Sequence, residues 1–452
     1  MGDLKYRDHT EGSVIASITR MGLPSMIGFA SANLYDIIDM FWVAKLGAEN
    51  VAAITIFFSF YWVISSANMI AGSGSVALIS RRYGEKNIHA TEAAIKEAIL
   101  LKWGLAIFFG IFGYIFLDKV LYILGARETV LVLAHDYGIV QFIGLGVSFS
   151  SFTIYTALRG VGDPVKAMVL MLSGVVLNII LDPFFIFGWW IFPELGVVGA
   201  AVASIISYAF SFTVGLIIFY GGFTSVRLHI KGKVPISLSQ ISQMIKIGFP
   251  SGINSISFSL SRVIIMPIVA VFGTNVVAAY GMGARISALG IMVIVGMGLG
   301  VSALIGQNLG AEKIERAKET AYKAILFSGS IMTAFAVVNI IGAPIIVRFF
   351  FDSEPLLSLG VTLIRIISIA LPFIGISITM EMVYSGAGEN KPAMFFSILQ
   401  SWVILIPMIL FATHVMHFNQ DGVWWSMTIS NIIAMALFYL YFQRGKWLLK
   451  KV

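Results

Sequence analysis

Three carboxylates and one amide lie inside long apolar stretches of this chain. Asp36 and Asp39 are three residues apart, and Asn178 and Asp182 are four residues apart, so each pair would share one face of a helix. An ionised carboxylate in a membrane is costly unless it is paired or hydrated, and such residues are usually functional. Two neighbouring carboxylates either share a proton or bind a small hard cation through their oxygens. These residues therefore predict a site for H⁺ or Na⁺, with Na⁺ ligands expected at Asp39, Asn178 and Asp182.

The composition of the chain places these residues in a membrane. Of its 452 residues, 58% are hydrophobic and 12% are charged, and the mean hydropathy is +0.91. These values exclude a soluble globular protein. The apolar stretches are continuous and too long for barrel strands, which favours an all-α integral membrane protein. About twelve transmembrane helices are expected, within residues 17–45, 51–80, 91–117, 129–157, 165–188, 196–221, 241–272, 277–306, 317–347, 356–384, 392–417 and 421–443.

The two halves of the chain align with each other without a gap at an offset of 226 residues. Many of the matches are glycines and prolines: Gly22, Pro24, Gly74, Gly84 and Gly160 fall on Gly248, Pro250, Gly300, Gly310 and Gly386. Each copy holds six spans, so both copies insert with the same orientation. We therefore expect two six-helix lobes, residues 1–221 and 241–452, related by an approximate two-fold axis along the membrane normal. Residues 222–240 form the expected cytoplasmic linker between the lobes.

The candidate ion ligands occur in only one of the two copies. At the same offset, the positions of Asp36, Asp39, Asn178 and Asp182 are taken by Arg262, Ile265, Ile404 and Met408. A channel built from repeats would favour a polar lining supplied evenly by both copies. A symmetric scaffold with acids in one lobe instead favours a transporter whose coupling site lies off-centre, with a cleft between the lobes that opens to either side.

The basic residues indicate the orientation in the membrane. If the N-terminus is inside, the internal segments hold most of the lysines and arginines, including Arg81, Arg82, Arg159, Lys166, Arg227, Lys231, Lys313, Arg316 and Lys391. The opposite loops hold only Lys45, Lys119, Arg127 and Arg348. The positive-inside rule then predicts a multi-pass protein of the cell inner (plasma) membrane with both termini in the cytoplasm. Contact with the lipid bilayer accounts for the net charge of +7, so no nucleic acid is expected as a partner.

The second half carries one acid deep in a span, Glu381, which aligns with Tyr155 of the first copy. Its candidate partners are Arg262 and Arg365, and we favour a structural ion pair over a counter-ion for a substrate. Methionine adapts to varied apolar ligands, although in membrane spans it more often serves packing. Four methionines are weaker candidates for substrate contacts on the cavity side: Met266, Met282, Met292 and Met297.

The sequence holds no recognisable catalytic or nucleotide-binding pattern. A P-loop is missing, so ATP bound by this chain would not drive transport. Cysteine is absent, which excludes disulfides and thiol chemistry. His414 and His417 are three residues apart at a helix end and lack a nearby third metal ligand. We therefore expect a protein that is not an enzyme and that needs no cofactor besides its coupling ion, H⁺ or Na⁺.

Over nearly its full length the chain resembles the multidrug and toxic compound extrusion (MATE) family, and within it the prokaryotic DinF-like branch. The resemblance implies twelve helices in two six-helix lobes around a central cavity, driven by inward flow of H⁺ or Na⁺. The matching motifs are Gly22-Leu-Pro-Ser25, Tyr35-Asp-Ile-Ile-Asp39, Leu158-Arg-Gly-Val-Gly-Asp-Pro164, Asn178-Ile-Ile-Leu-Asp-Pro183 and Gly196-Val-Val-Gly-Ala-Ala-Val-Ala-Ser204.

The resemblance also assigns roles to single positions. Asp39, Asn178 and Asp182 match the coupling-site positions of that branch. Tyr35 and Tyr137 match supporting positions, and Ser204 stands where a threonine is usual. Asp36 replaces the usual asparagine and adds a titratable group to the site. The acid that another branch carries in the seventh span is absent from residues 241–272, which favours a site in the N-terminal lobe alone.

These observations predict a cation-coupled antiporter that exports amphipathic, often cationic organic compounds or drugs by alternating access, as a monomer. One alternative is a flippase for lipids or lipid-linked precursors from the same superfamily, which would show wide lateral openings and a strongly cationic central cavity. A second alternative is a membrane receptor or channel that does not transport such compounds. The internal repeat and the acids confined to one lobe argue against the receptor or channel.

Overall fold

The computed structural model describes residues 8–229 and 236–450, and all the regular structure in these ranges is helical. The first half forms α1 (Val14–Ala44), α2 (Ala48–Gly84), α3 (Ile88–Ile123), α4 (Glu128–Ile143), α5 (Leu145–Gly160), α6 (Pro164–Phe187) and α7 (Val197–Tyr220). The second half begins with α8 (Leu238–Ala270), α9 (Thr274–Gly310), α10 (Ile314–Phe350) and α11 (Glu354–Ala387). It ends with α12 (Lys391–Ile398), η1 (Leu399–Leu405), α13 (Ile406–Leu410), η2 (Phe411–Val415), α14 (Gln420–Phe442) and η3 (Lys446–Leu449).

The expected twelve transmembrane helices are confirmed. Within the described residues, eleven helical stretches are long and apolar enough to cross a membrane, with Lys391–Val415 counted as one. The pair α4 and α5 makes the twelfth span, bent by 52° at Gly144. A Cβ atom on Gly144 would lie 2.3 Å from the side chain of Ile205 on α7, so the bend presses the backbone against its neighbour where only glycine fits. The sequence pattern predicts this span but does not predict that it is bent.

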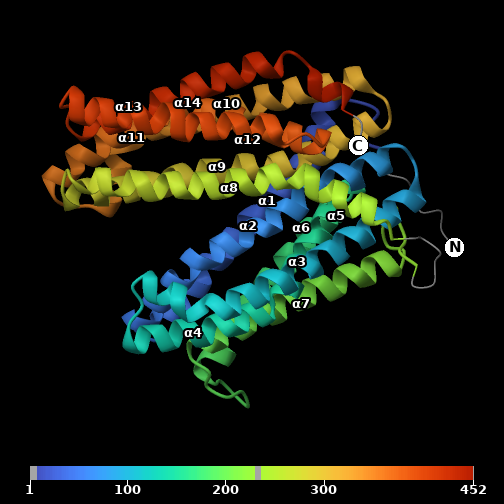
Figure 1. Cartoon of the computed structure of the whole chain (residues 1–452), viewed down its shortest axis with the longest axis horizontal. Coiled ribbons are helices and arrows are strands. Elements are labelled where there is room, and N and C mark those ends of the chain that lie inside the picture. The colour runs from blue at the N-terminus through green and yellow to red at the C-terminus, as the bar shows by residue number, and fades with distance from the viewer. Residues whose placement is uncertain (1–7, 230–235, 451–452) are drawn as a thin grey trace.

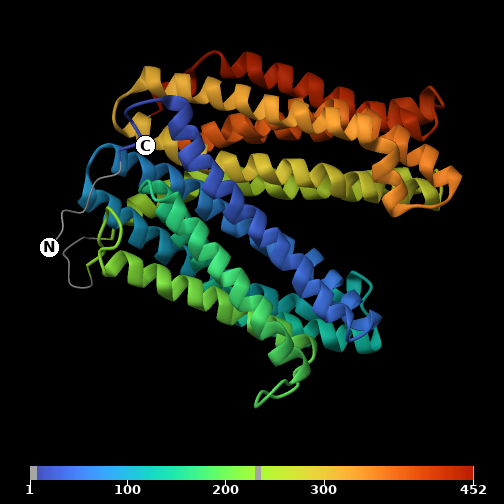
Figure 2. The same cartoon turned by 180° about the vertical axis from the view of Figure 1, so that it is seen from behind.

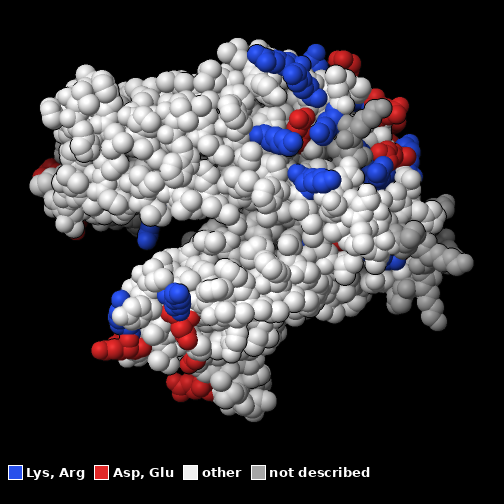
Figure 3. All heavy atoms as spheres, viewed as in Figure 1, with Lys and Arg blue, Asp and Glu red and all other residues white. Residues whose placement is uncertain are grey.

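The helices form two arms that meet at one end (Figure 1). Helices α1 to α7 build one arm and α8 to α14 the other, and the view from behind shows the same division (Figure 2). We call the end where the arms meet, and where both ends of the described chain lie, the closed end, and the opposite end the open end. The space-filling view shows a cleft between the arms at the open end (Figure 3). The two lobes expected from the repeat are therefore present, while their predicted boundaries stay predictions.

The contacts between the lobes repeat themselves with the offset of the sequence. A Cβ atom on Gly84 at the end of α2 would lie 2.1 Å from the carbonyl oxygen of Gln307 on α9. A Cβ atom on Gly310 at the end of α9 would lie 2.0 Å from the carbonyl oxygen of Arg81 on α2. Residues 84 and 310, and residues 81 and 307, are equivalent in the two copies. Each contact is thus the copy of the other, as an approximate two-fold axis between the lobes requires.

Three helix pairs carry most of the contact between the lobes, α1 with α9, α2 with α8, and α2 with α9. Glycines face backbone in all three. Gly74 of α2 lies against Met244 of α8, and its equivalent Gly300 of α9 lies against Met21 of α1. We call these glycines, together with Gly84 and Gly310, the glycine seam. Small residues let helix backbones approach closely inside a membrane, where packing replaces the hydrophobic effect as the driving force.

The connection between the lobes runs from the end of α7 to the start of α8. Its described part is fixed to the first turns of α3, because the His229 backbone N–H donates to Glu92 Oε1 (2.7 Å) and the Ser237 backbone N–H donates to Glu97 Oε1 (2.7 Å). Residues 230–235 of the expected linker lie outside the described residues, as do Lys5, Arg7 and Lys451 of the expected basic segments.

One span breaks the symmetry of the two copies. Helix α6 is a regular α-helix, whereas its equivalent, residues 391–415, contains two π-helical stretches, η1 and η2. Pro407 lies just after η1 and cannot donate a backbone hydrogen bond, and its ring crowds the carbonyl one turn earlier. A π-helical stretch is one way in which a helix absorbs such a break.

The glycine seam predicts a contrast between two glycines of α2. Gly74→Ala should destabilise the protein by about 1–3 kcal/mol, because the new Cβ would meet backbone that cannot move aside. Its Cβ would lie 2.1 Å from the Met244 carbonyl oxygen. Gly72→Ala is the matched control, since no atom lies within 4 Å of its Cβ position. Alanine there should be neutral or stabilise the helix by up to about 1 kcal/mol. Thermal unfolding of both purified variants measures the contrast, and equal melting temperatures would contradict the seam.

Candidate functional site

Three of the four predicted oxygen-bearing residues come together where α1 packs against α6. Asp39 of α1 is 4% exposed, and Asn178 and Asp182 of α6 are fully buried. The Asn178 side-chain N–H donates to Asp182 Oδ1 at 3.0 Å. Pro183 follows Asp182 inside the helix, which removes one backbone hydrogen bond of α6 next to the acid.

Each of these three residues keeps one buried oxygen without a hydrogen-bond partner. The three atoms are Asp39 Oδ1, Asn178 Oδ1 and Asp182 Oδ2. The Asp39 and Asp182 carboxylates are also close enough to interact electrostatically. Buried polar atoms are nearly always satisfied in native proteins, so three such oxygens on two facing helices form a candidate site for a proton or a cation. Carboxylate and amide oxygens are suitable donors for a hard cation, so these residues fit Na⁺ as well as H⁺.

Two tyrosines surround this oxygen cluster. The Tyr35 hydroxyl of α1 hydrogen-bonds to Ser204 Oγ of α7. The Gln141 side-chain N–H donates to the Tyr137 hydroxyl of α4 at 3.0 Å, and Tyr137 is 1% exposed. Both tyrosines are within electrostatic range of Asp39. The Tyr35–Ser204 bond therefore joins α1 to α7, whereas the Tyr137–Gln141 bond lies within α4.

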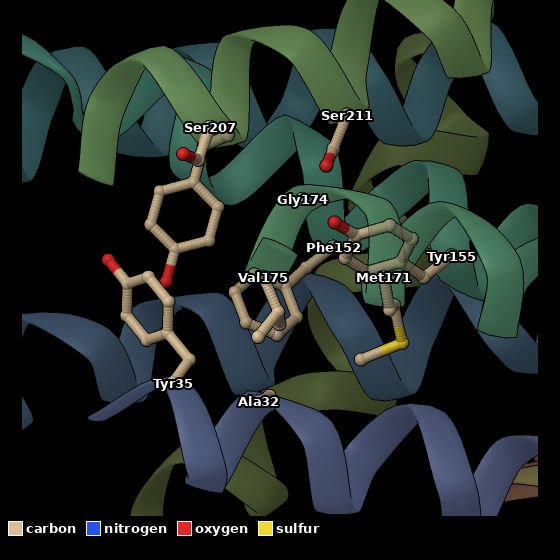
Figure 4. A pocket seen from close by; sticks show the side chains of 10 residues that line it. Ala32, Tyr35, Phe152, Tyr155, Met171, Gly174, Val175, Ser207 and Ser211 are labelled. Atoms are coloured by element: carbon tan, nitrogen blue, oxygen red, sulfur yellow. The ribbon is translucent and has the colours of Figure 1, made fainter. Parts of the chain in front are cut away.

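A small cavity of about 40 Å³ lies next to Tyr35 inside the N-terminal lobe. Figure 4 shows Tyr35 of α1 together with Phe152 and Tyr155 of α5, Met171 of α6, and Ser207 and Ser211 of α7 around it. A space of this size holds a water molecule or an ion rather than a drug. Tyr35 lines this cavity and is also within electrostatic range of Asp39, whereas the three residues of the oxygen cluster do not line it.

Sequence reasoning missed one residue of this region, Tyr208. It lines the same cavity, and its ring lies 6.2 Å from that of Tyr35 and 6.3 Å from that of Phe152. The spacing held a signal, because Tyr208 follows Ser204 by four residues and so shares its helix face.

Asp36 does not join the buried cluster. More than a third of its surface is exposed, although it lies within electrostatic range of Asp39 one turn away. A separation of three residues turns the helix by about 300°, so neighbouring faces of α1 carry the two acids. The structure thus separates one buried acid from one open acid on the same helix, a distinction that spacing alone did not predict.

Two expectations for the C-terminal lobe are wrong. Glu381 forms no ion pair within the described ranges, and Arg262 instead lies over the Phe258 ring at 5.1 Å. Met282 does not face the cleft but is buried among Ala343, Val347 and Ile364. Helix α9 is long enough to contact both its own lobe and the other one, so its methionines point in different directions. Met297 packs against Gly22 of α1 and Met292 is half-buried, while Met266 of α8 is 41% exposed.

The C-terminal lobe has no second copy of the oxygen cluster. Ile265, the equivalent of Asp39, is 3% exposed and packs in an apolar core with Leu405, Ile409 and Trp424. Ile404 and Met408 stand in place of Asn178 and Asp182. No group of three or more histidines or acids with metal-binding geometry occurs in the part of the chain that the structure describes. His414 contacts the neighbouring Thr413 hydroxyl.

Comparison with known families decides the identity of this scaffold. The MatE family model matches residues 24–184 and again residues 250–411. The two matches begin 226 residues apart, so the family unit coincides with the internal repeat. The chain belongs to the MatE family. The expected family and the expected twelve helices in two lobes are thereby confirmed.

Similar proteins cover almost the whole length of this MatE chain. The probable multidrug resistance protein YoeA of Bacillus subtilis (strain 168) is 26% identical over 449 residues, which are 95% of this chain and 94% of that protein. The FAD transporter of Shewanella oneidensis is 27% identical over 314 residues, 69% of this chain and 68% of that protein. A solved structure described as the outward-facing conformation of a multidrug resistance MATE family transporter of the MOP superfamily has a TM-score of 0.89 and 25% identity. It covers 100% of this chain and 99% of that chain.

The oxygen cluster predicts which acids this MatE chain needs. Asp39→Asn and Asp182→Asn should each reduce gradient-driven efflux to background while the protein still folds, because asparagine keeps the shape but loses the titratable charge. Efflux by purified protein in proteoliposomes and a thermal unfolding curve measure the two properties. The repeat supplies a control: Met408→Leu, at the position equivalent to Asp182, should leave efflux nearly unchanged. Normal efflux by either asparagine variant would remove its acid from the coupling site.

Proposed function

We propose that this MatE protein is an antiporter that exports amphipathic, often cationic organic compounds in exchange for H⁺ or Na⁺. The observation that carries the proposal is the set of three buried oxygens without partners, on Asp39, Asn178 and Asp182. Only the N-terminal lobe holds them, because the equivalent residues are apolar. Family membership supports transport, and the cluster supplies a reason for coupling it to a cation.

The exchange follows from the charge of the cluster. When both carboxylates are ionised, a buried like-charged pair inside a membrane needs compensation by a cation, by water or by the substrate. A proton or Na⁺ that arrives at Asp39 and Asp182 neutralises the pair. Helices α1 and α6 then pack more closely, and bending is easiest near Pro24 and Pro183, where backbone hydrogen bonds are missing.

Release of the substrate is the consequence of this neutralisation. A ligand shifts a conformational equilibrium only by its different affinity for the two states. A cationic substrate favours the ionised cluster and disfavours the neutral one, so the arrival of the ion weakens its binding. The open acid, Asp36, lies one turn from Asp39 with more than a third of its surface exposed, where a passing cation can reach it.

We propose that the closed end faces the cytoplasm of a cell with this protein in its plasma membrane, and that both termini are cytoplasmic. Lysine and arginine side chains gather near the closed end on the face seen in Figure 3, as the positive-inside rule requires of a cytoplasmic surface. The cleft then opens outward. The similar solved structure in its outward-facing conformation supports this orientation.

A flippase for lipids or lipid-linked precursors is the second candidate, and one relative is named as a FAD transporter, whose cargo is anionic. Either cargo would favour cationic walls in the cleft. The clearest ionisable cluster in this chain is instead acidic, which supports cationic compounds. A receptor or channel is less well supported, because the chain belongs to a family whose named relatives transport or confer drug resistance. We expect the monomer to be the working unit, since each chain holds one complete cleft.

The scheme predicts competition between ion and substrate. Lowering the pH from about 8 to about 5, where carboxylates in low-dielectric surroundings take up protons, should weaken the binding of a fluorescent cationic dye. The decrease should be roughly 5- to 150-fold, the usual range of coupling between two sites. If Na⁺ is the coupling ion, added Na⁺ should weaken binding at constant pH. Asp39→Asn should bind the dye weakly at every pH. Dye affinity that changes with neither ion would refute the coupling scheme, even if the protein exports drugs.

A further inference from the structure

The first described residues of the chain cross from one lobe to the other at the closed end. We call residues 8–13, which precede α1, the N-terminal tie. Their attachment to the C-terminal lobe is made by two cations of α10 and its cap. Lys313 Nζ donates to the Thr10 carbonyl oxygen (3.1 Å) and to its hydroxyl (2.9 Å). The Arg316 guanidinium donates to the carbonyl oxygens of Gly12 (2.8 Å) and Glu11 (2.9 Å).

The same segment is attached to the N-terminal lobe by Asp8, whose carboxylate lies 3.8 Å from Lys86 Nζ, and by His9. His9 Nε2 lies 3.0 Å from the carbonyl oxygen of Gly162, so the ring N–H donates to the turn between α5 and α6. That turn leads directly into α6, the helix of Asn178 and Asp182. At its other end the tie continues into α1, the helix of Asp39, because Ser13 is the N-cap residue of α1.

The spacing of these contacts limits how far the lobes can separate. The His9 side chain is bonded to the N-terminal lobe, whereas the His9 carbonyl oxygen accepts from Arg316 of the other lobe at 3.3 Å and Thr10 is bonded to Lys313. One residue cannot span a gap that widens by several ångström, since neighbouring Cα atoms are only about 3.8 Å apart. The lobes therefore cannot part at this point unless the bonds of Asp8 and His9 to the N-terminal lobe, or the bonds to Lys313 and Arg316, break first.

The other end of the chain crosses the same boundary in the opposite direction. Arg81 of α2, in the N-terminal lobe, donates to the carbonyl oxygen of Lys450 (2.7 Å), which follows η3 of the C-terminal lobe. Arg81 is buried and its own backbone carbonyl lies against Gly310. Both chain ends are thus bonded to the lobe from which they do not arise.

We propose that the N-terminal tie is a latch that stabilises the closed end and so sets the population of the conformation with the open cleft. The proposal assumes the alternating access of the proposed function, but not the identity of the ion or the substrate. When the closed end opens, the tie must release one lobe. Its bonds to Lys313 and Arg316 involve full charges, and one such bond changes an equilibrium by about tenfold or more.

The absence of cysteine from the chain makes a direct test feasible. Cysteines introduced at His89 and Lys391, both exposed and near the closed end, carry spin labels on the two lobes. Pulsed electron paramagnetic resonance in proteoliposomes then measures the distance between the labels. Lys313→Ala combined with Arg316→Ala should raise the ratio of the wider to the narrower population at least tenfold. Lys318→Ala, an exposed lysine of the same helix outside the tie, is the matched control and should leave the ratio unchanged.

A second variant changes a contact of the tie with the N-terminal lobe, so that the proposal can still be tested if the first variant does not fold. His9→Ala should shift the ratio in the same direction, because it removes the bond that joins the tie to the turn before α6. A variant that combines His9→Ala with Lys313→Ala and Arg316→Ala should raise the ratio of the wider to the narrower population no more than the stronger of the two separate variants does. Independent local effects on this ratio would instead add in free energy. Distances that match the Lys318→Ala control in all tie variants, or effects that simply add, would overturn the latch. Failure of ion-driven efflux alone would count against the proposed function and leave the measured distances valid.

Discussion

An oxygen atom that is buried in a membrane protein without a hydrogen-bond partner is the constraint on which the rest of this structure depends. The N-terminal lobe holds three such atoms where α1 meets α6. The neighbouring polar side chains bond to other atoms and not to these three oxygens. Tyr35 is bonded to Ser204, Tyr137 to Gln141, and Asn178 donates its N–H to the other oxygen of Asp182. The three oxygens are thus available to the proton or Na⁺ of the proposed function.

The two copies of the repeat share their backbone but differ in the side chains at the oxygen cluster. Both copies place equivalent glycines against the other lobe, and Gly47 and Gly273 form the same left-handed turn before α2 and α9, with φ of +112° and +105°. The backbone framework is thus shared. The side chains at the oxygen cluster are not, and the span equivalent to α6 is interrupted by π-helical turns around Pro407. One lobe carries the candidate ion site, and the other repeats the backbone without those side chains.

Much of this could be predicted from the sequence, because the bilayer and the repeat are strong constraints. The twelve spans and the two lobes follow from apolar length and an offset of 226 residues. Rotation about a helix axis is less constrained when a helix touches neighbours on several sides. For this reason the sequence does not show that Met282 is buried within its lobe, that Glu381 forms no ion pair in the described ranges, or that Asp36 lies beside the cluster. The bend at Gly144 depends on contact with Ile205, a neighbour more than sixty residues away, which no local pattern reports.

The glycine seam has a mechanical consequence. At these positions backbone lies against backbone, so no side chain stands between the two helices there. Helices in such contact can roll or slide without the rotamer changes that interlocked side chains demand. The resistance to movement of the lobes then comes from contacts outside the seam, such as the charged hydrogen bonds at the closed end.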